Sequence, residues 1–308
     1  MEKIDFEFIK NRDVGELIQD YLSLFKKIFR HFNRCIFKFI LPFLAIFLVL
    51  FFFASSLGVD IFYSKDWRTS SVVIIMILVV MLVAIFYFTF IPTFGLEYMF
   101  LLKEKENTDF NGKEVWQRVK RHMGKYIVFF LASIVVMLIL AIPLALAALI
   151  FTFIPIAGQI AFGIAMACVL LVFVCGLFLY LEDRETVFDS FLAAFRLLRK
   201  KLLAYGLTAY IFRLLVGISL LLITIIPSAI LGVIAYNTIG FNEQILISFG
   251  GKIMISILGT LVILFSTISS IYTMTFYTLI YFSSLEATNK EGSIAQLDQI
   301  GLTHDEDN

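Results

Sequence analysis

Long apolar runs alternate with short basic segments along the entire chain. Five stretches of more than 20 residues carry no charged side chain, and these are 39–59, 69–96, 126–181, 214–242 and 253–285. A transmembrane helix needs ~20 apolar residues to cross about 30 Å of hydrocarbon. The third stretch is long enough for two such helices. Pro155 and Gly158 mark a turn between them, because Pro removes a backbone donor and Gly permits a tight reversal.

The apolar pattern therefore predicts an all-α fold, a polytopic membrane bundle of six transmembrane helices. The expected spans are 36–57, 70–92, 126–152, 158–181, 207–236 and 254–282. All of them belong to a single membrane-embedded domain, 1–286. The remaining residues, 287–308, form a polar, acidic tail on the cytoplasmic side. We expect this tail to be disordered apart from a turn or two of helix near Leu297.

A basic amphipathic segment precedes each pair of spans, at 13–34, 111–125 and 186–203. In the first and third segments, apolar residues such as Phe191 and Phe195 recur at the three- and four-residue spacing of one helix face. The second segment has a weaker stripe. The chain is thus predicted to consist of three units, each an amphipathic helix followed by a transmembrane hairpin.

Each amphipathic segment opens with a pair typical of a capping box, an acceptor side chain followed three residues later by a carboxylate. The pairs are Asp13 with Glu16, Asn111 with Glu114, and Thr186 with Asp189. Such a pair satisfies backbone N–H groups in the first helical turn, and negative charge suits that end of the helix dipole. We therefore expect helices to begin at these three places.

Positive charge lies almost entirely on one side of the predicted membrane, although the net charge is only +1. The termini and the amphipathic segments hold 21 Lys and Arg residues, whereas the opposite loops hold three, Lys65, Arg68 and Lys252. Because Lys and Arg are retained on the cytoplasmic side, both termini are predicted to be cytoplasmic. A composition of 60% hydrophobic and 16% charged residues favours the same membrane class.

The basic residues of the amphipathic segments suggest two alternative roles. In one, the helices lie in the membrane interface and bind anionic head groups, so that membrane lipids are the expected partners. In the other, the helices pack on the spans and their charges only set the topology. The candidate head-group contacts are Lys26, Lys27, Arg30, Arg118, Lys120, Arg121, Arg199, Lys200 and Lys201.

Arg213 is the one charge clearly inside a predicted span. Charge within the bilayer is costly and is a functional hypothesis by default. Arg213 follows the third basic segment closely enough to snorkel to the cytoplasmic interface. Glu97, near the cytoplasmic end of the second span, is a candidate ion-pair partner for it.

The last span is the most polar, and its residues Ser266, Ser270 and Thr273 share one helix face. Small hydroxyl residues on one face line either a water-filled crevice or a close helix–helix contact. The first alternative points to a solute path, and the second to a packed bundle.

The sequence carries no recognisable motif for catalysis. It has no HExxH pattern, no glycine-rich nucleotide loop and no GxSxG pattern, and the Cys and His residues lack metal-ligand spacing. We predict a non-enzyme with no cofactor, no metal site and no nucleic-acid partner. A membrane enzyme would have to assemble its site at the interface from Glu97, Glu182, Asp183 and Arg184.

Three loose motifs resemble a group of poorly characterised bacterial integral membrane proteins. They are Arg12-Asp13-Val14-Gly15-Glu16-Leu17-Ile18, Glu185-Thr186-Val187 through Ser190-Phe191, and Tyr281-Phe282-Ser283-Ser284-Leu285-Glu286. The likeness is to the membrane domain attached to some glycerophosphodiester phosphodiesterases. The resemblance implies a bacterial inner-membrane location and a stand-alone membrane module. It carries over no phosphodiesterase domain and no catalytic residue.

The function hypotheses follow in order of preference. The first is a structural or interaction module that organises a membrane complex or its lipid environment. The second is a permease-like transporter of a small solute, with a polar path along the last span. The third is an interfacial enzyme that handles lipids.

Overall fold

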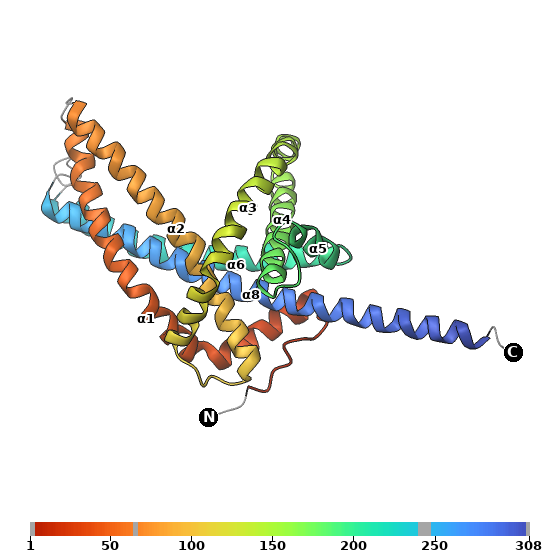
Figure 1. Ribbon diagram of the computed structural model, residues 1–308. Coiled ribbons are helices and arrows are strands. Elements are labelled where there is room, and N and C mark those ends of the chain that lie inside the picture. The colour runs from red at the N-terminus through yellow and green to blue at the C-terminus, as the bar shows by residue number, and fades with distance from the viewer. Residues whose placement is uncertain (1–3, 64–66, 240–247, 306–308) are drawn as a thin grey trace.

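The structure is a computed structural model that describes residues 4–63, 67–239 and 248–305. Every regular element in these ranges is a helix (Figure 1). The helices are α1 (Val14–Tyr63), α2 (Trp67–Lys105), α3 (Gly112–Thr152), α4 (Ala157–Leu181), α5 (Asp189–Leu198), α6 (Leu202–Ile239) and α8 (Phe249–Asp305). The all-α prediction is therefore confirmed over the described part of the chain.

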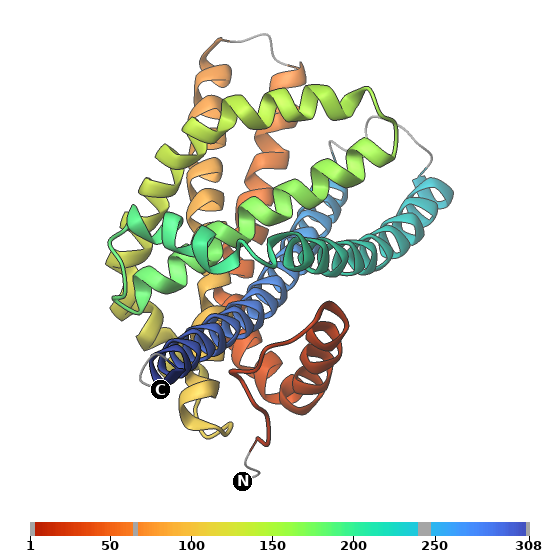
Figure 2. The ribbon, with the colours of Figure 1, turned by 90° about the vertical axis from the view of Figure 1, so that its right-hand side faces the viewer.

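Two helical hairpins diverge from a common base. Figure 1 shows α1 with α2 as one hairpin and α3 with α4 as the other, both rising from the base and spreading apart. At the base, α8 contacts α1, α2, α4 and α6, while the short helix α5 lies mainly against α4. The C-terminal part of α8 projects beyond the bundle, as Figure 1 shows, and Figure 2 shows α8 crossing between the two hairpins.

Aromatic side chains form the core at this base. The ring of Phe32 from α1 lies 4.6 Å from that of Tyr98 in α2, measured between centroids. Phe212 of α6 stacks on Phe276 of α8 at 4.1 Å, and all four rings are buried. Aromatic pairs of this kind add about 0.5–1.5 kcal/mol beyond the burial of their surface. The helices are therefore joined most firmly at one end of the molecule.

Within the residues that the structure describes, five helical segments are long and apolar enough to cross a membrane. They are Val14–Ser56, Gly112–Thr152, Ala157–Leu181, Leu202–Ile226 and Phe249–Ala287. Large apolar side chains are exposed along them, and no residue of α3 beyond Ala132 is buried. Exposed apolar surface of this extent marks a membrane or partner contact, and here it suggests a multi-pass membrane protein. The expected span 70–92 lies in α2, although several of its side chains fall outside the described residues.

The predicted turn between the third and fourth spans is confirmed. Helix α3 ends at Thr152 and α4 begins at Ala157. Ile156 has a positive φ of 63°, and a Cβ atom at Gly158 would collide with the carbonyl oxygen of Phe151. Only glycine fits this approach of backbone to backbone, which explains why the reversal falls here.

The amphipathic segments differ in how they join the spans. The first, 13–34, is not a separate helix, because α1 continues from Val14 into the first span. The second is likewise the start of α3. The third is shorter than predicted, since α5 covers only Asp189–Leu198 and α6 begins at Leu202. A continuous helix saves the cost of a second nucleation, which explains the merged elements.

The tail prediction is wrong for the residues that the structure describes. Helix α8 runs to Asp305, so 287–305 is helical rather than disordered. The tail contains no proline, and extending an existing helix requires no new nucleus. Residues 306–308 lie outside the described part of the chain.

Residues 4–13 cross the base and contact both the residue that follows α2 and helix α8. The backbone N–H of Ile4 donates to the Glu106 carbonyl (2.9 Å), and that of Arg12 donates to Ser283 Oγ of α8 (2.9 Å). The Arg12 side chain is 1% exposed and lies 2.7 Å from Asp20 Oδ2. Its guanidinium also donates to backbone carbonyls, including those of Glu7 and Phe8. Arg12 therefore holds the N-terminal segment in place.

Candidate functional site

A cavity of about 250 Å³ lies where α2, α3 and α4 meet at the base of the bundle. We call it the charged cavity, because six of its lining residues are titratable. It is lined by Glu97, Phe100, Lys103, Glu104, Arg118, His122, Leu181 and Glu182. The cavity thus collects charge from three helices next to the apolar spans.

Helical spacing brings these side chains together. Glu97 and Glu104 are seven residues apart on α2, and Arg118 and His122 are four apart on α3, so each pair shares a helix face. The start of α3 is fixed by a complete capping box in which Asn111 and Glu114 each accept from the other's backbone N–H. This cap confirms the predicted helix start and sets the register of Arg118 and His122 against α2.

Glu97 is the buried centre of the cluster, with 1% of its side chain exposed. Its Oε1 accepts from the hydroxyl of Tyr126 at 2.5 Å and lies 2.6 Å from His122 Nδ1. Its Oε2 lies 2.9 Å from Arg118 Nε, whose N–H is not aligned for a hydrogen bond. A buried carboxylate needs such partners, because an uncompensated charge in the interior is strongly unfavourable. Glu97 therefore clamps α2 to α3.

Arg118 is shared between two carboxylates. Its Nη1 and Nη2 atoms donate to the two oxygens of Glu104 at 2.5 and 2.6 Å, a bidentate pair. Hydrogen bonding to this guanidinium lowers the pKa of the Glu104 carboxyl below its ordinary value. Bidentate pairing of this kind fixes geometry as well as charge. Arg118, one of the predicted head-group contacts, is therefore already paired with Glu97 and Glu104.

Lys103 and Glu182 form the other side of the charged cavity. Lys103 Nζ lies 4.4 Å from the centroid of the Phe282 ring, and it makes no ion pair with any residue that the structure describes. Burial lowers the pKa of its ammonium, and Glu182 nearby opposes that shift. Glu182 Oε2 accepts from the Tyr281 hydroxyl at 3.0 Å and lies 2.6 Å from Arg184 Nε. Lys103 thus carries a positive charge into the cavity without an ion-pair partner among the residues that the structure describes.

His122 faces the cavity with one nitrogen already used. Because the Glu97 carboxylate accepts from Nδ1, the Nε2 atom is left to interact with whatever enters. Metal binding is not indicated, since no group of three or more His, Cys, Asp and Glu side chains among the described residues has the geometry of a metal site. The arrangement can bind a small polar group that offers both charge signs.

Sequence reasoning identified Glu97 and Glu182 but missed His122, Lys103, Tyr126 and Tyr281. The shared helix faces of the pairs on α2 and α3 were available as a signal. Nothing in the sequence indicated that the two faces meet. Glu97 also takes Arg118 and His122 as partners rather than Arg213, which is exposed on α6.

A second feature lies on α5, where apolar residues occupy two helix faces. One face packs into the bundle, with Phe191, Ala194 and Leu198 buried. The other, which we call the α5 apolar face, consists of Phe188, Leu192 and Phe195, each about half exposed at 57%, 51% and 47%. The side chains of Arg196, Arg199 and Lys200 are exposed beside it. Helix α5 therefore packs one apolar face against the bundle and leaves a second apolar face exposed.

The first half of α1 follows the same plan. Tyr21, Leu24 and Ile28 are buried, whereas Leu22 and Phe29 are exposed. Of the head-group candidates, those exposed are Lys26, Lys27, Arg30, Lys120, Arg121, Arg199 and Lys200. Lys201 instead donates to Asn11 (3.0 Å) and lies 3.4 Å from Asp13.

The hydroxyl groups of α8 bond mainly within their own helix. Thr273 Oγ1 donates to the carbonyl of Ser269 at 2.8 Å, and Thr267 donates to that of Ile263 at 2.6 Å. Thr267 also reaches the Tyr87 hydroxyl of α2 at 2.9 Å. Ser266 and Ser270 are half-buried on the same helix. The hydroxyls are thus satisfied mainly by the backbone of α8, and the Thr267–Tyr87 bond joins α8 to α2.

Fold and site together define an all-helical protein with several helices long and apolar enough to cross a membrane. Comparison of the chain with protein-family models, curated proteins and solved structures finds no match.

Proposed function

We propose that the protein is a bacterial inner-membrane module that organises a membrane complex or its lipid environment. Its six spans would place both termini in the cytoplasm, with the first half of α1 and helix α5 at the cytoplasmic interface. There the exposed basic residues would bind anionic head groups. The proposal assigns no catalytic activity and needs no cofactor.

The α5 apolar face is the observation that carries this proposal. Phe188, Leu192 and Phe195 remain exposed, whereas the adjacent face of α5 is buried in the bundle. An exposed apolar face flanked by cations is typical of helices that lie in a membrane interface. Arg196, Arg199 and Lys200 are exposed, and in this proposal they would contact head groups at that level.

A permease is supported less well. The cavity between α1, α6 and α8 has a volume of about 390 Å³, and apolar side chains such as Ile18, Phe212 and Ile268 dominate its lining. The hydroxyl groups of Thr267 and Thr273 are occupied by carbonyls of α8 itself. These features favour helix packing over a water-filled path along the last span.

The charge of α5 provides a direct test. The triple variant R196Q/R199Q/K200Q, purified in mild detergent, should retain less anionic lipid than the wild type, as measured by mass spectrometry of extracted lipids. Each cation near an anionic surface contributes about 1 kcal/mol, so the loss should be large. The charge-matched control K65Q/R68Q/K252Q changes the predicted opposite face and should retain lipid normally. Equal retention in all three proteins would contradict the proposal.

A further inference from the structure

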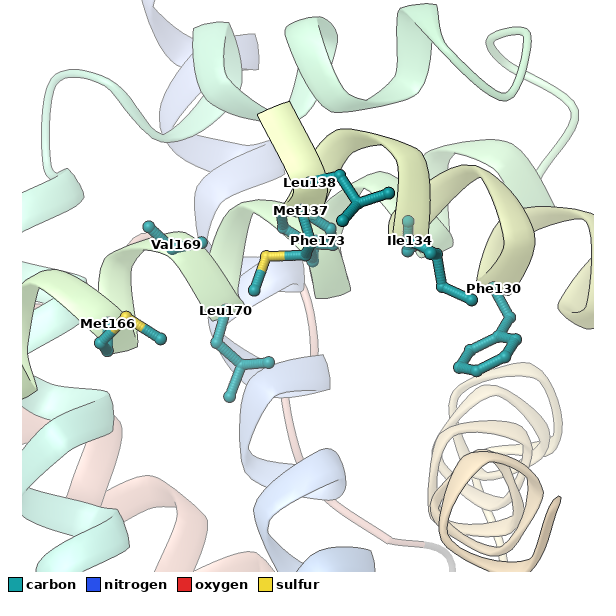
Figure 3. Close-up of a pocket in the computed structure, with 9 residues that line it drawn as sticks. Phe130, Ile134, Met137, Leu138, Met166, Val169, Leu170 and Phe173 are labelled. Carbon is teal, nitrogen blue, oxygen red and sulfur yellow. The ribbon is translucent and has the colours of Figure 1, made fainter. Parts of the chain in front are cut away.

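Helices α3 and α4 enclose two hollows of opposite character. The charged cavity lies at the base, and an apolar groove of about 410 Å³ lies further along the same two helices. Figure 3 shows Phe130, Ile134 and Met137 of α3 and Met166, Leu170 and Phe173 of α4 lining this α3–α4 groove. A polar hollow next to an apolar one matches the two ends of an amphiphile.

The spacing of the two hollows suits one molecule. His122 of the cavity and Phe130 of the groove are eight residues apart on α3, about 12 Å along the helix axis. Leu181 and Phe173 are eight residues apart on α4 and give the same separation. Eight residues also turn by about 80° around each helix, so a lipid with its head group at the base would pass partly around α3 and α4 to place an acyl chain in the groove.

The charges of the cavity specify the head group. Arg118 is occupied by Glu104 and Glu97, so Lys103 is the cation available to an incoming anion. Glu182 uses one oxygen for Tyr281 and Arg184, which leaves its other oxygen, Oε1, without a hydrogen bond to any residue that the structure describes. A positive and a negative group therefore face the same small space.

We propose that the charged cavity and the α3–α4 groove together bind one phospholipid whose zwitterionic head group ends in a primary ammonium. The phosphate lies against Lys103 Nζ and the Nε2 edge of His122. The ammonium donates to Glu182, and one acyl chain lies in the groove. This site is separate from the α5 apolar face, and it selects a zwitterionic rather than an anionic head group.

Other head groups fit the charges less well. An anionic lipid would bring its charge near three carboxylates, those of Glu97, Glu104 and Glu182, which Arg118 and Lys103 offset only in part. A choline head group has no N–H to donate, so the Glu182 oxygen would be desolvated without a hydrogen bond, which is costly. The site is therefore expected to distinguish a primary ammonium from a trimethylammonium.

The test is native mass spectrometry of the full chain in detergent, with phosphatidylethanolamine, phosphatidylcholine and phosphatidylglycerol of identical acyl chains. At the site defined by the binding that K103M and E182Q remove, phosphatidylethanolamine should bind at least about tenfold more tightly than the other two, because charge-assisted hydrogen bonds depend on its ammonium. Phosphatidylglycerol held by the exposed cations of α1 and α5 should not change in these variants. Free phosphoethanolamine, which lacks acyl chains, should compete only weakly. Equal affinity for the three lipids would overturn the proposal, and competition by phosphoethanolamine at lipid concentrations would overturn the role of the groove.

Variants locate the site. K103M and E182Q should each lower phosphatidylethanolamine affinity by about tenfold, and L170W should lower it by filling the groove. The matched controls K105M and E185Q alter exposed charges outside the cavity and should bind normally. Thermal unfolding of each variant separates lost binding from lost fold, and K103R tests whether charge alone restores affinity. Normal binding by folded K103M and E182Q would overturn the assignment.

Discussion

Glu97 Oε2 of α2 and Arg118 Nε of α3 lie 2.9 Å apart at the base of the bundle, with Glu97 buried. The pair joins the first hairpin to the second, since Tyr126 and His122 of α3 bind the same carboxylate. Replacing both partners of a buried ion pair by apolar residues changes the free energy of unfolding little. Removing only one partner is costly, because the other charge stays buried without compensation. The Glu97–Arg118 pair therefore fixes the register of α2 against α3, which apolar contacts alone would not specify.

Removing one member of this pair should destabilise the fold. R118M leaves the Glu97 carboxylate buried with fewer partners, and the expected cost is about 3–5 kcal/mol. The double variant E97Q/R118M removes both charges and should recover part of the loss. Thermal unfolding in detergent measures both, with R121M as a control because Arg121 is exposed. A melting temperature for R118M equal to that of R121M would show that the pair does not clamp the helices.

The N-terminal segment should depend on Arg12. R12M removes the ion pair with Asp20 and the hydrogen bonds that the guanidinium donates to backbone carbonyls. Because unsatisfied buried carbonyls each cost about 1–3 kcal/mol, the segment 4–13 should detach. Limited proteolysis with N-terminal sequencing should then show faster cleavage within this segment. R34M, which changes an exposed arginine, should leave cleavage unchanged; slow cleavage in both variants would argue against the role of Arg12.

The free energy of unfolding should fall at acid pH, because protonation of Glu104 weakens its pairing with Arg118. Arg118 lowers the folded-state pKa of Glu104, so the stabilisation is fully present above the unfolded-state pKa of about 4.3 and is lost as the pH falls through the folded value. Glu104 is half exposed, so the effect is about 0.2–1 kcal/mol. The difference in melting temperature between wild type and E104Q should shrink below about pH 4. A melting-temperature difference that stays constant on acidification would show that it does not arise from the charge of Glu104.

The predicted orientation can be tested by labelling. Single cysteines at Lys65 and Arg199 in a cysteine-free background should differ in intact cells, with the first labelled by an impermeant maleimide and the second protected. Lys65 lies outside the described residues, whereas Arg199 is exposed beside α5. Protection at 65 with labelling at 199 would reverse the topology. Permeabilised cells, in which both positions should react, provide the control for accessibility.

The apolar runs, the turn at Pro155–Gly158 and the capping box at Asn111 were predictable because each rests on local chemistry. The end of the predicted segment 13–34 was wrong, because α1 runs from Val14 to Tyr63 without a break. The helical tail shows the same effect, since α8 continues past Glu286 without a stop signal.

The charged cavity depends on tertiary structure and therefore escaped prediction in part. The spacing of Glu97 and Glu104 places them on one face, but their partners come from α3, and only the fold decides that the two faces meet. Glu97 was predicted as a partner of Arg213 because the sequence pattern predicts that both are near the cytoplasmic end of a span. Depth in the membrane, which sequence gives, does not determine which helices are neighbours.

The central claim is that the α5 apolar face lies in the membrane interface. A cysteine at Leu192, labelled with an environment-sensitive fluorophore and reconstituted into vesicles, tests it when spin-labelled lipids are added. The account predicts quenching by a label near the head groups, with much weaker quenching of the same fluorophore at Glu185, which is exposed off this face. Equal, weak quenching at both positions would contradict it, because Leu192 would then face water or another protein.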